Sequence, residues 1–327
     1  MSRLMLLCAW LCAMVFVVVG NPAQAKNSFS YVSSTGNDSN ACDTSATACL
    51  TFAGALAQTA NYGEIDCVNA GIYGYDFTIA QSVTIDCAGG VGSTVGIITI
   101  SGAAIVVRLR NLTINNTVGT GLLESGFGID AQNMAALYVE NCVITNYTDT
   151  SVFSSAPYLG IKFEPSAGES QLFVINSIIS DNGNSGSSLS GGIYIVPGSG
   201  VTAEVSIDRS QINGNYFGIV GDGRSGGIIK GTISDSVVSG NAENGITALS
   251  SGSSVVFITD QTKVSGNGAA GLFAGGSNAG ILASRTTVFG NAVGLDASGG
   301  GTLFTYGNNR VNGNTTNGAF TGTVGLQ

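Results

Sequence analysis

The sequence has no histidine among its 327 residues. This absence excludes Ser-His-Asp and Cys-His catalysis, imidazole general bases and the histidine sites that usually bind transition metals. Any chemistry on this chain must therefore use carboxylates, Arg, Lys or Tyr.

Charge is also scarce. Charged residues make up 9% of the chain, and 11 Lys and Arg stand against 20 Asp and Glu, for a formal net charge of −9. A chain this acidic is a poor partner for nucleic acids or anionic membranes, and we expect neither. Gly, Ser, Thr and Asn are abundant, and disorder would fit that polarity, but 44% hydrophobic residues indicate a folded core instead.

Only one long apolar run is present, from Leu4 to Gly20. Arg3 precedes it, and Ala23-Gln24-Ala25 follows as an A-x-A site. This pattern is typical of a secretory signal peptide, residues 1–25, with cleavage after Ala25. A membrane anchor is the alternative, but the run is at the short limit for spanning. We therefore expect a secreted protein, periplasmic or extracellular, with no transmembrane anchor after cleavage.

Five cysteines follow the predicted signal peptide. Cys42 and Cys49 enclose a short polar loop, and we predict a disulfide between them in an oxidising compartment. Cys67 and Cys87 stand in matched contexts, "GEIDC" and "VTIDC", and either stack or bond. Cys142 occupies a place that Ser or Thr takes elsewhere, so we expect a small buried residue rather than a reactive thiol.

Internal repeats follow in the second half of the chain. Five segments share a Gly-Asn pair, with a β-branched residue shortly before it and a Gly-apolar pair shortly after. The steps between the asparagines are 26, 26, 24 and 23 residues. The asparagines are Asn215, Asn241, Asn267, Asn291 and Asn314, and the β-branched residues are Ile212, Val238, Val264, Val288 and Val311.

The repeat predicts the fold. Each unit of about 24 residues holds two or three runs too short for helices and rich in Val, Ile, Thr and Phe. Gly and Asn tolerate the positive φ of tight corners between such runs. We predict an all-β, single-stranded parallel β-helix, in which equivalent residues stack at about 4.8 Å and the asparagines form a hydrogen-bonded column. A propeller blade needs about 40 residues, and a leucine-rich repeat needs a regular Leu spacing that this sequence lacks.

A solenoid must cover the open end of its first coil. In "TFAGALAQTA", Thr51 to Ala60, the residues Phe52, Ala55, Leu56 and Thr59 fall on one face of a short helix. This segment predicts an N-terminal capping helix. We divide the chain into a signal peptide (1–25), an entry strand with disulfide loop and cap helix (26–63), and a parallel β-helix domain (64–327).

The segment "YVSSTGNDSNACDTSATACLTFAGALA", Tyr31 to Ala57, resembles the entry motif of right-handed parallel β-helix proteins of the pectate-lyase-like superfamily. In that motif a Tyr-Val-Ser strand and a Gly-Asn-Asp turn precede a cap helix that begins at Thr. The Gly-Asn repeats resemble the coils of the same superfamily, so the resemblance extends from Tyr31 to the C-terminus. It implies a right-handed helix. It also implies that any polysaccharide lyase, hydrolase or esterase site would lie on the outward face of one parallel sheet.

Polar residues of the middle coils gather on one predicted outward face. The residue after each inward Ile or Leu should point outward, because side chains alternate along a strand. We take Lys162, Glu164, Asp222 and Arg224 as candidate catalytic residues, and Asp130 and Tyr194 as candidate substrate-binding residues. The column directly after the inward residues is Asp130, Lys162, Tyr194, Val220, Thr247, Phe273, Asp296 and Phe320. Two residues further along lie Gln132, Glu164, Val196 and Asp222, with Arg224 just beyond.

Two interpretations of this cluster stay open. Glu164 and Asp222 lie two coils apart, about 10 Å by strand spacing, which is compatible with an inverting carboxylate pair. Alternatively, Asp130–Lys162 and Asp222–Arg224 are solvated surface ion pairs of little energetic weight.

Asp66 and Asp86 form a second candidate, since the matched "IDC" triplets place both carboxylates in one column. Two such charges either raise one pKa or attract a cation, for which calcium is the natural choice outside the cell. We predict no required cofactor or metal, because few further oxygen ligands are at hand and solvated aspartates are the alternative. Tyr194, Tyr216, Phe217 and Phe273 either stack on sugars or fill the interior.

Three functions remain open. The first is a non-catalytic protein that binds carbohydrate or a cell-surface partner. The second is a polysaccharide lyase or glycoside hydrolase that works without histidine. The third is a structural or adhesive envelope protein.

Overall fold

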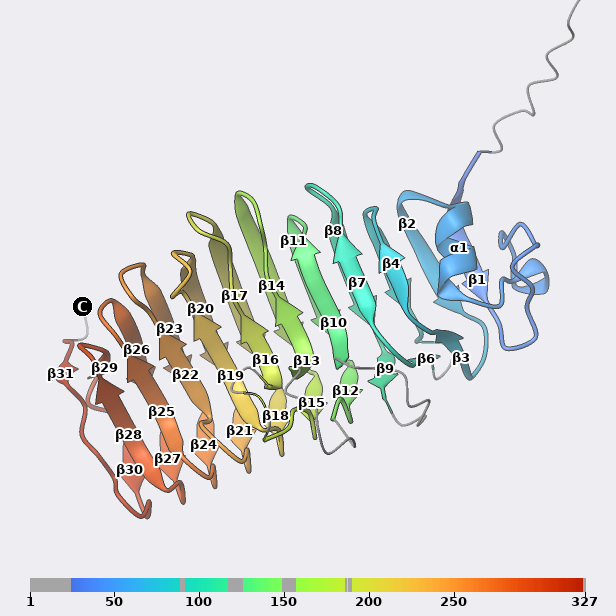
Figure 1. The fold of residues 1–327 in the computed structure, drawn as a ribbon. Helices are drawn as coiled ribbons and strands as arrows, with labels where there is room; N and C mark the ends of the chain where they lie inside the picture. Colours follow the sequence, from blue (N-terminus) through green and yellow to red (C-terminus); the bar gives the residue numbers. More distant parts are fainter. Residues whose placement is uncertain are drawn as a thin grey trace, which may run out of the picture.

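The computed structural model describes residues 25–88, 92–116, 126–148, 157–185, 187 and 190–325. Within these residues the strands form three parallel sheets of 12, 10 and 9 strands, and the successive coils follow one another along one axis (Figure 1). The predicted signal peptide lies outside the described residues, apart from Ala25. No helix in the described part of the chain is long and apolar enough to cross a membrane.

The 12-stranded sheet runs the length of the molecule. Its strands, in spatial order, are β1 (Asn27–Val32), β2 (Thr59–Cys67), β5 (Val83–Asp86), β8 (Val106–Arg110), β11 (Ala136–Glu140), β14 (Glu169–Ile175), β17 (Thr202–Asp208), β20 (Ile228–Ser234), β23 (Val255–Asp260), β26 (Ala279–Ser284), β29 (Thr302–Thr305) and β31 (Gly322–Thr323).

The other two sheets complete each coil. The 10-stranded sheet comprises β3 (Gly71–Gly74), β6 (Gly92–Thr94), β9 (Leu112–Asn115), β12 (Val143–Thr145), β15 (Ile178–Ser180), β18 (Gln211–Asn213), β21 (Val237–Ser239), β24 (Lys263–Ser265), β27 (Thr287–Phe289) and β30 (Arg310–Asn312). The 9-stranded sheet comprises β4 (Phe77–Ile79), β7 (Ile98–Ser101), β10 (Gly126–Asn133), β13 (Tyr158–Phe163), β16 (Gly191–Ile195), β19 (Phe217–Asp222), β22 (Ile246–Leu249), β25 (Ala270–Gly275) and β28 (Val293–Ser298).

Successive coils stack in register. The chain passes from the 12-stranded to the 10-stranded to the 9-stranded sheet and then begins the next coil, as in β17, β18, β19 and β20. Ile219, Ile246, Leu272 and Leu295 are direct partners in neighbouring strands, and all four are buried. The predicted all-β parallel β-helix is therefore confirmed. The β-branched column from Ile212 to Val311 is paired in the same way.

The corner between the 10-stranded and 9-stranded sheets holds the predicted asparagine column. Asn241 Oδ1 accepts bonds from the backbone and side-chain amides of Asn215 at 3.0 and 3.2 Å. Its own side-chain amide donates to Asn267 Oδ1 at 2.9 Å and to the Ile212 carbonyl at 3.2 Å. Gly240 turns the chain just before it at φ 64, which explains the Gly-Asn pair. The column also includes Asn182, which the repeat pattern did not reveal.

The corner between the 12-stranded and 10-stranded sheets uses a different column. At this corner of successive coils, a residue with positive φ, such as Asp235 at φ 48, is followed by a buried Ser or Thr, such as Ser236. Ser210 donates its N–H to Ser236 Oγ at 3.0 Å, and the same contact recurs between coils. Cys142 belongs to this column and donates its N–H to Ser177 Oγ at 3.1 Å. Burial raises the pKa of its thiol to about 12, so it is an inert buried residue, as predicted.

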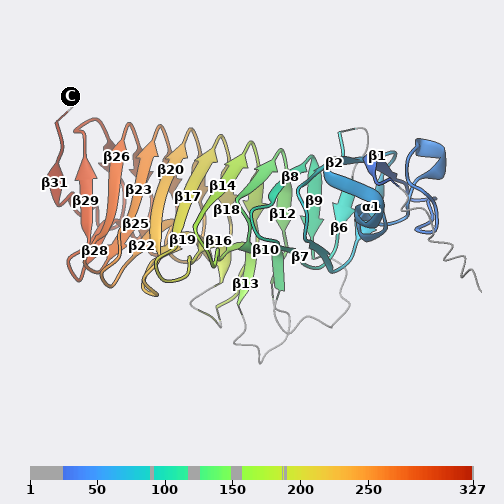
Figure 2. The ribbon, with the colours of Figure 1, turned by 90° about the horizontal axis from the view of Figure 1, so that it is seen from above.

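The N-terminal end is closed by α1 (Phe52–Gln58), which lies across the first coils (Figure 2). Thr51 caps the helix by accepting the Gly54 N–H at 3.0 Å. Phe52 packs edge-on against Tyr73, with ring centroids 5.6 Å apart. Together with Ala55, Leu56 and Thr59 it forms the buried face that the sequence predicted.

Two disulfides hold this end of the molecule. Cys42 bonds Cys49 across the entry loop, which contains the short 3-10 helix η1 (Ser45–Thr47). Cys67 bonds Cys87 between neighbouring coils, with Cα atoms 4.7 Å apart. The matched "IDC" contexts thus mark a bonded pair.

One predicted position is wrong. Phe320 does not continue the outward column after Asp296, because the 9-stranded sheet ends at β28. The chain turns at Gly318 with φ 73, and Phe320 packs against the core instead.

The asparagine column generates a stability prediction. Asn241→Ala removes four side-chain hydrogen bonds and leaves the buried backbone N–H of Asn215 without its acceptor, so we expect a loss of about 2–4 kcal/mol in the free energy of unfolding. Chemical denaturation measures this loss. Asn312→Ala, at an exposed asparagine of the same corner region, should change stability by less than about 0.5 kcal/mol. Equal losses in the two variants would contradict a special role for the column.

Candidate functional site

The first part of the predicted site is centred on Lys162 in β13. Its ammonium group lies 2.6 Å from Glu164 Oε1 and 3.9 Å from Asp130 Oδ1. Gln132 donates to the other oxygen of Asp130 at 2.7 Å. Asp130 Oδ1 is buried and accepts no hydrogen bond. The Lys162 ammonium group, at the longer distance of 3.9 Å, is therefore the charge that balances it. Lys162 thus bridges two carboxylates of neighbouring strands.

A depression of about 570 Å³ lies beside this group and is referred to as the Glu164 depression. Its lining includes Glu164, Gln132 and Val196. Glu164 therefore faces space that a ligand can enter.

The second part of the predicted site is centred on Asp222 at the end of β19. Arg224 donates to both of its oxygens, at 2.9 and 2.7 Å, and Tyr194 donates its hydroxyl at 2.8 Å. Burial alone would raise the pKa of Asp222, but these bonds and the Arg224 N–H hold it below its usual value. Asp222 is consequently a fixed carboxylate whose oxygens are already engaged.

The two parts remain separate. No hydrogen bond or ion pair joins the Lys162 group to the Asp222 group among the residues that the structure describes. Between them, Tyr194 is only 6% exposed and packs with Leu159 and Val220 in a small apolar cluster on the outer face of the 9-stranded sheet. The register aligns the predicted column, but its middle is an apolar layer rather than an open charged surface.

Asp66 and Asp86 are register partners in β2 and β5, as the matched triplets predicted. Asp86 Oδ1 accepts bonds from Asn111 at 2.7 Å and from the Ala88 N–H at 2.9 Å. Burial, together with the charges of Glu64 and Asp86, raises the pKa of Asp66 to about 6. Among the described residues no group of three or more His, Cys, Asp or Glu is arranged to hold a metal ion.

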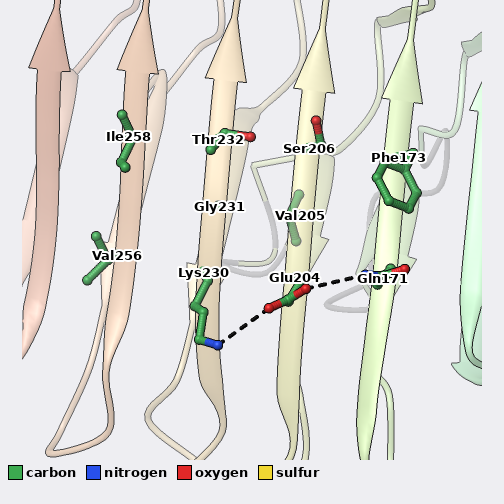
Figure 3. Close-up of a pocket in the computed structure, with 10 residues that line it drawn as sticks. All are labelled: Gln171, Phe173, Glu204, Val205, Ser206, Lys230, Gly231, Thr232, Val256 and Ile258. Atoms are coloured by element: carbon green, nitrogen blue, oxygen red, sulfur yellow. Dashed lines mark hydrogen bonds and ion pairs between the residues drawn. The ribbon is translucent and has the colours of Figure 1, made fainter.

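A hollow that the sequence did not predict lies on the outer face of the 12-stranded sheet (Figure 3). It has a volume of about 470 Å³, and we call it the aromatic hollow. Strands β14, β17, β20 and β23 form it. Its lining residues are Gln171, Phe173, Glu204, Val205, Ser206, Lys230, Gly231, Thr232, Val256 and Ile258.

The shape of the aromatic hollow follows from one column of outward residues. Phe173, Ser206, Thr232 and Ile258 are partners in successive strands. The two middle side chains are short, while Phe173 and Ile258 stand at the two ends. The hollow is therefore the gap that two small residues leave between two large ones.

The Phe173 end continues into an aromatic stack. The rings of Phe173 and Tyr138 are stacked, with centroids 4.5 Å apart and planes 10° apart. The guanidinium carbon of Arg108 lies 3.8 Å from the Tyr138 centroid, a cation–π contact. Tyr138 thus covers one side of the Phe173 ring, and Phe173 lines the hollow on the side away from Tyr138.

A polar row borders the aromatic hollow. Glu204 Oε1 lies 3.4 Å from Lys230 Nζ, and Gln171 Nε2 donates to Glu204 Oε2 at 3.3 Å (Figure 3). These hydrogen bonds, first that from Gln171, hold the pKa of Glu204 below its usual value. The row offers an amide, a carboxylate and an ammonium group within two strand spacings of one another.

The sequence does contain a signal for the hollow. Aligning "VRLRN", "LYVEN" and "LFVIN" on their last residues, Asn111, Asn141 and Asn176, places Arg108, Tyr138 and Phe173 in one column. These asparagines all have positive φ at the same corner. The Gly-Asn repeats mark the opposite side of each coil and therefore did not reveal this column.

The comparisons with known proteins agree with the fold. A family model described as "Right handed beta helix region" matches residues 74–261. Among solved structures, pectate lyase Pel9A matches with a TM-score of 0.57 and 15% identity, over 86% of this chain and 74% of that chain. At this identity the likeness concerns the fold alone. A comparison with curated proteins finds no match. The family match confirms the right-handed sense of the helix.

The raised pKa of Asp66 generates a pH prediction. Between the unfolded pKa near 4 and the folded pKa of about 6, only the native state keeps the proton, so this residue lowers stability as pH rises through that window. We expect Asp66→Asn to stabilise the protein at pH 8, by ~1 kcal/mol after allowance for solvent screening, and to have no effect near pH 4. Thermal denaturation across this pH range measures the difference. Asp296→Asn, at an exposed carboxylate, is the control, and a pH-independent effect of Asp66→Asn would contradict the assignment.

Proposed function

The chain belongs to the right-handed β-helix family, and from this premise we propose that it is a secreted protein that binds carbohydrate at the aromatic hollow without cleaving it. One observation carries the proposal. The stack of Arg108, Tyr138 and Phe173 ends at an open space bordered by hydrogen-bonding groups.

The chemistry of the aromatic hollow suits a sugar ring. A pyranose presents C–H groups on its faces and hydroxyls at its rim, so it pairs an aromatic contact with several hydrogen bonds. Phe173 supplies the aromatic contact and continues an existing stack. Glu204, Lys230 and Gln171 supply acceptors and donors at one border, and the hydroxyls of Ser206 and Thr232 lie in the middle. The volume of about 470 Å³ is within the usual range for small-ligand sites.

The secreted location rests on two features. Residues 1–25 read as a signal peptide, and two disulfides fasten the first coils. Disulfides persist in oxidising compartments, where extracellular glycans are also found.

Binding without cleavage is favoured by the carboxylate content of the aromatic hollow. Glu204 is the acidic residue in its lining, and Lys230 and Gln171 already bond it. Hydrolysis of a glycoside normally requires two carboxyl groups that flank the bond, one of them protonated. A single ionised carboxylate supports recognition rather than hydrolysis.

Catalysis is a second candidate, and one observation favours it. Lys162 and Glu164 are paired beside the Glu164 depression, which opens on the 9-stranded sheet. The matched structure is that of a pectate lyase, so polysaccharide lyase or hydrolase activity at this depression is the natural alternative. Here Lys162 and Glu164 would exchange a proton with the substrate. Asp222 and Arg224 are not among the residues that line this depression and would take no part.

The binding proposal predicts an effect of Phe173. Phe173→Ala should weaken affinity for a bound oligosaccharide at least about tenfold, because it removes the stacking surface. Isothermal titration against a panel of neutral and uronic-acid oligosaccharides measures it. Phe289→Ala removes an exposed ring from the 10-stranded sheet and should leave affinity unchanged. If no glycan of the panel binds, or if both variants bind as the wild type does, the aromatic hollow is not the site and a structural role gains weight.

The catalytic alternative predicts released products. Incubation with the same glycans, with and without calcium, should yield unsaturated or new reducing ends only if the chain is an enzyme. In that case Glu164→Gln should lower the rate at least about a hundredfold, as expected when a general acid or base is lost. Glu169→Gln, at an exposed carboxylate of β14, should keep the wild-type rate. Products formed at an unchanged rate by Glu164→Gln would place the reaction elsewhere.

A further inference from the structure

A concave recess lies where the 12-stranded sheet turns into the 10-stranded sheet, near the C-terminal coils. Its volume is about 400 Å³, and it is separate from both the aromatic hollow and the Glu164 depression. Lys263, Arg285 and Arg310 line it together with Asn308, and no carboxylate is among its lining residues. We call it the basic recess.

The convergence of these cations is unusual for this chain, which has 11 Lys and Arg in 327 residues and a net charge of −9. An acidic protein repels anions at long range, so a local cluster of positive charge must come from specific placement. Two columns of the β-helix provide that placement.

The first column lies on the outer face of the 10-stranded sheet. Lys263 in β24, Thr287 in β27 and Arg310 in β30 are direct register partners. The two cations therefore stand two strand spacings apart, about 10 Å between backbones. The short side chain of Thr287 lies between them, so space for a ligand group is left between two positive charges.

The second column contributes Arg285, which occupies the positive-φ corner position at φ 45. Its guanidinium group bonds both oxygens of Asp260, which fixes its orientation. Its N–H donates to Asn308 Oδ1 at 3.0 Å, which anchors the corner to the next coil. More than half of the Arg285 side chain stays exposed, at 55%, so donors remain for a ligand.

The other two cations are not neutralised within the described residues. Lys263 and Arg310 form no ion pair with any carboxylate there, whereas Arg285 does. The negative charges that act on Arg285 are those of Asp260 and Asp235. Three positive charges thus face two negative ones, and neither carboxylate lines the basic recess.

We propose that the basic recess binds an oxyanion, a sulfate or carboxylate group carried by a sugar or present as a free ion. Guanidinium groups form paired hydrogen bonds with such groups, and an ammonium group adds an unshared charge. Lys263 and Arg310, which lie on either side of Thr287 in the column, would both bind the anion. Arg285 would donate further hydrogen bonds and so fix the orientation of the anion. This site is independent of the aromatic hollow, because a different face and different residues form it.

The test is titration of the purified chain at constant ionic strength with inorganic sulfate, glucuronate, sulfated glucose and, as the uncharged control, glucose. We expect saturable binding of at least one of the three anions and none of glucose. Amide chemical shifts in NMR spectra should move at residues 261–263, 285–287 and 308–310. Binding of sulfate alone would indicate a free ion as the ligand, and tighter binding of a charged sugar would indicate a glycan substituent.

Matched variants distinguish binding at the basic recess from a general effect of the net charge of the protein. Lys263→Gln and Arg310→Gln should each weaken anion affinity about fivefold or more. Lys26→Gln makes the same change in net charge at the opposite end of the molecule and should leave the affinity as it is. Phe173→Ala should also leave anion binding intact, so failure at the aromatic hollow is distinguishable from failure here. No saturable binding of any anion, or equal weakening by Lys26→Gln and Lys263→Gln, would overturn the proposal.

Discussion

Parallel pairing of each strand with the strand one coil earlier is the constraint on which this structure depends. The backbone hydrogen bonds between coils set a spacing near 4.8 Å, and they place every residue directly against its counterpart. A side chain in such a column has the same neighbours above and below, so each column must consist of groups that tolerate stacking on themselves. Ile, Val and Leu satisfy this inside, and amides or hydroxyls satisfy it at the two corners, where Asn241 and Ser236 bond their counterparts. Where the residue type changes along an outward column, the surface acquires a local hollow or a local group of charges.

The features of interest on the outer surface all arise from such changes. The aromatic hollow exists because Ser206 and Thr232 interrupt a column of large side chains between Phe173 and Ile258. The basic recess exists because Thr287 separates Lys263 from Arg310. The Lys162 group exists because a cation stands between the strands of Asp130 and Tyr194 in a column that is otherwise mostly uncharged. In each case the regular backbone is a scaffold, and the departure from repetition provides the chemistry.

Part of the candidate site was predictable from the sequence, and part was not. The period of the repeats placed Asp130, Lys162 and Tyr194 in one column correctly, because strand alternation and register follow from the inward Ile residues. The period could not show that Tyr194 is buried within an apolar cluster with Leu159 and Val220. Nor could it show that both oxygens of Asp222 are hydrogen-bonded by Arg224 and Tyr194. Those outcomes depend on side-chain conformations and on neighbours two coils away. The Gly-Asn repeats do not reveal Tyr138 and Phe173, because these residues lie on the face opposite to the Gly-Asn corner.

The sequence by itself determined the architecture. The Gly-Asn corners, the β-branched columns and the Thr51 cap are local signals that recur, and repetition at one period permits few structures other than a stack of coils. Only the tertiary structure decided where cavities form on the outer surface of that stack, which charged side chains are paired and which are not. Lys263 and Arg310 are 47 residues apart in the chain, and Phe173 and Ile258 are 85 apart, yet each pair borders one cavity. Cavities and charge balance are properties of the space between side chains, and that space is defined only after the coils have been stacked.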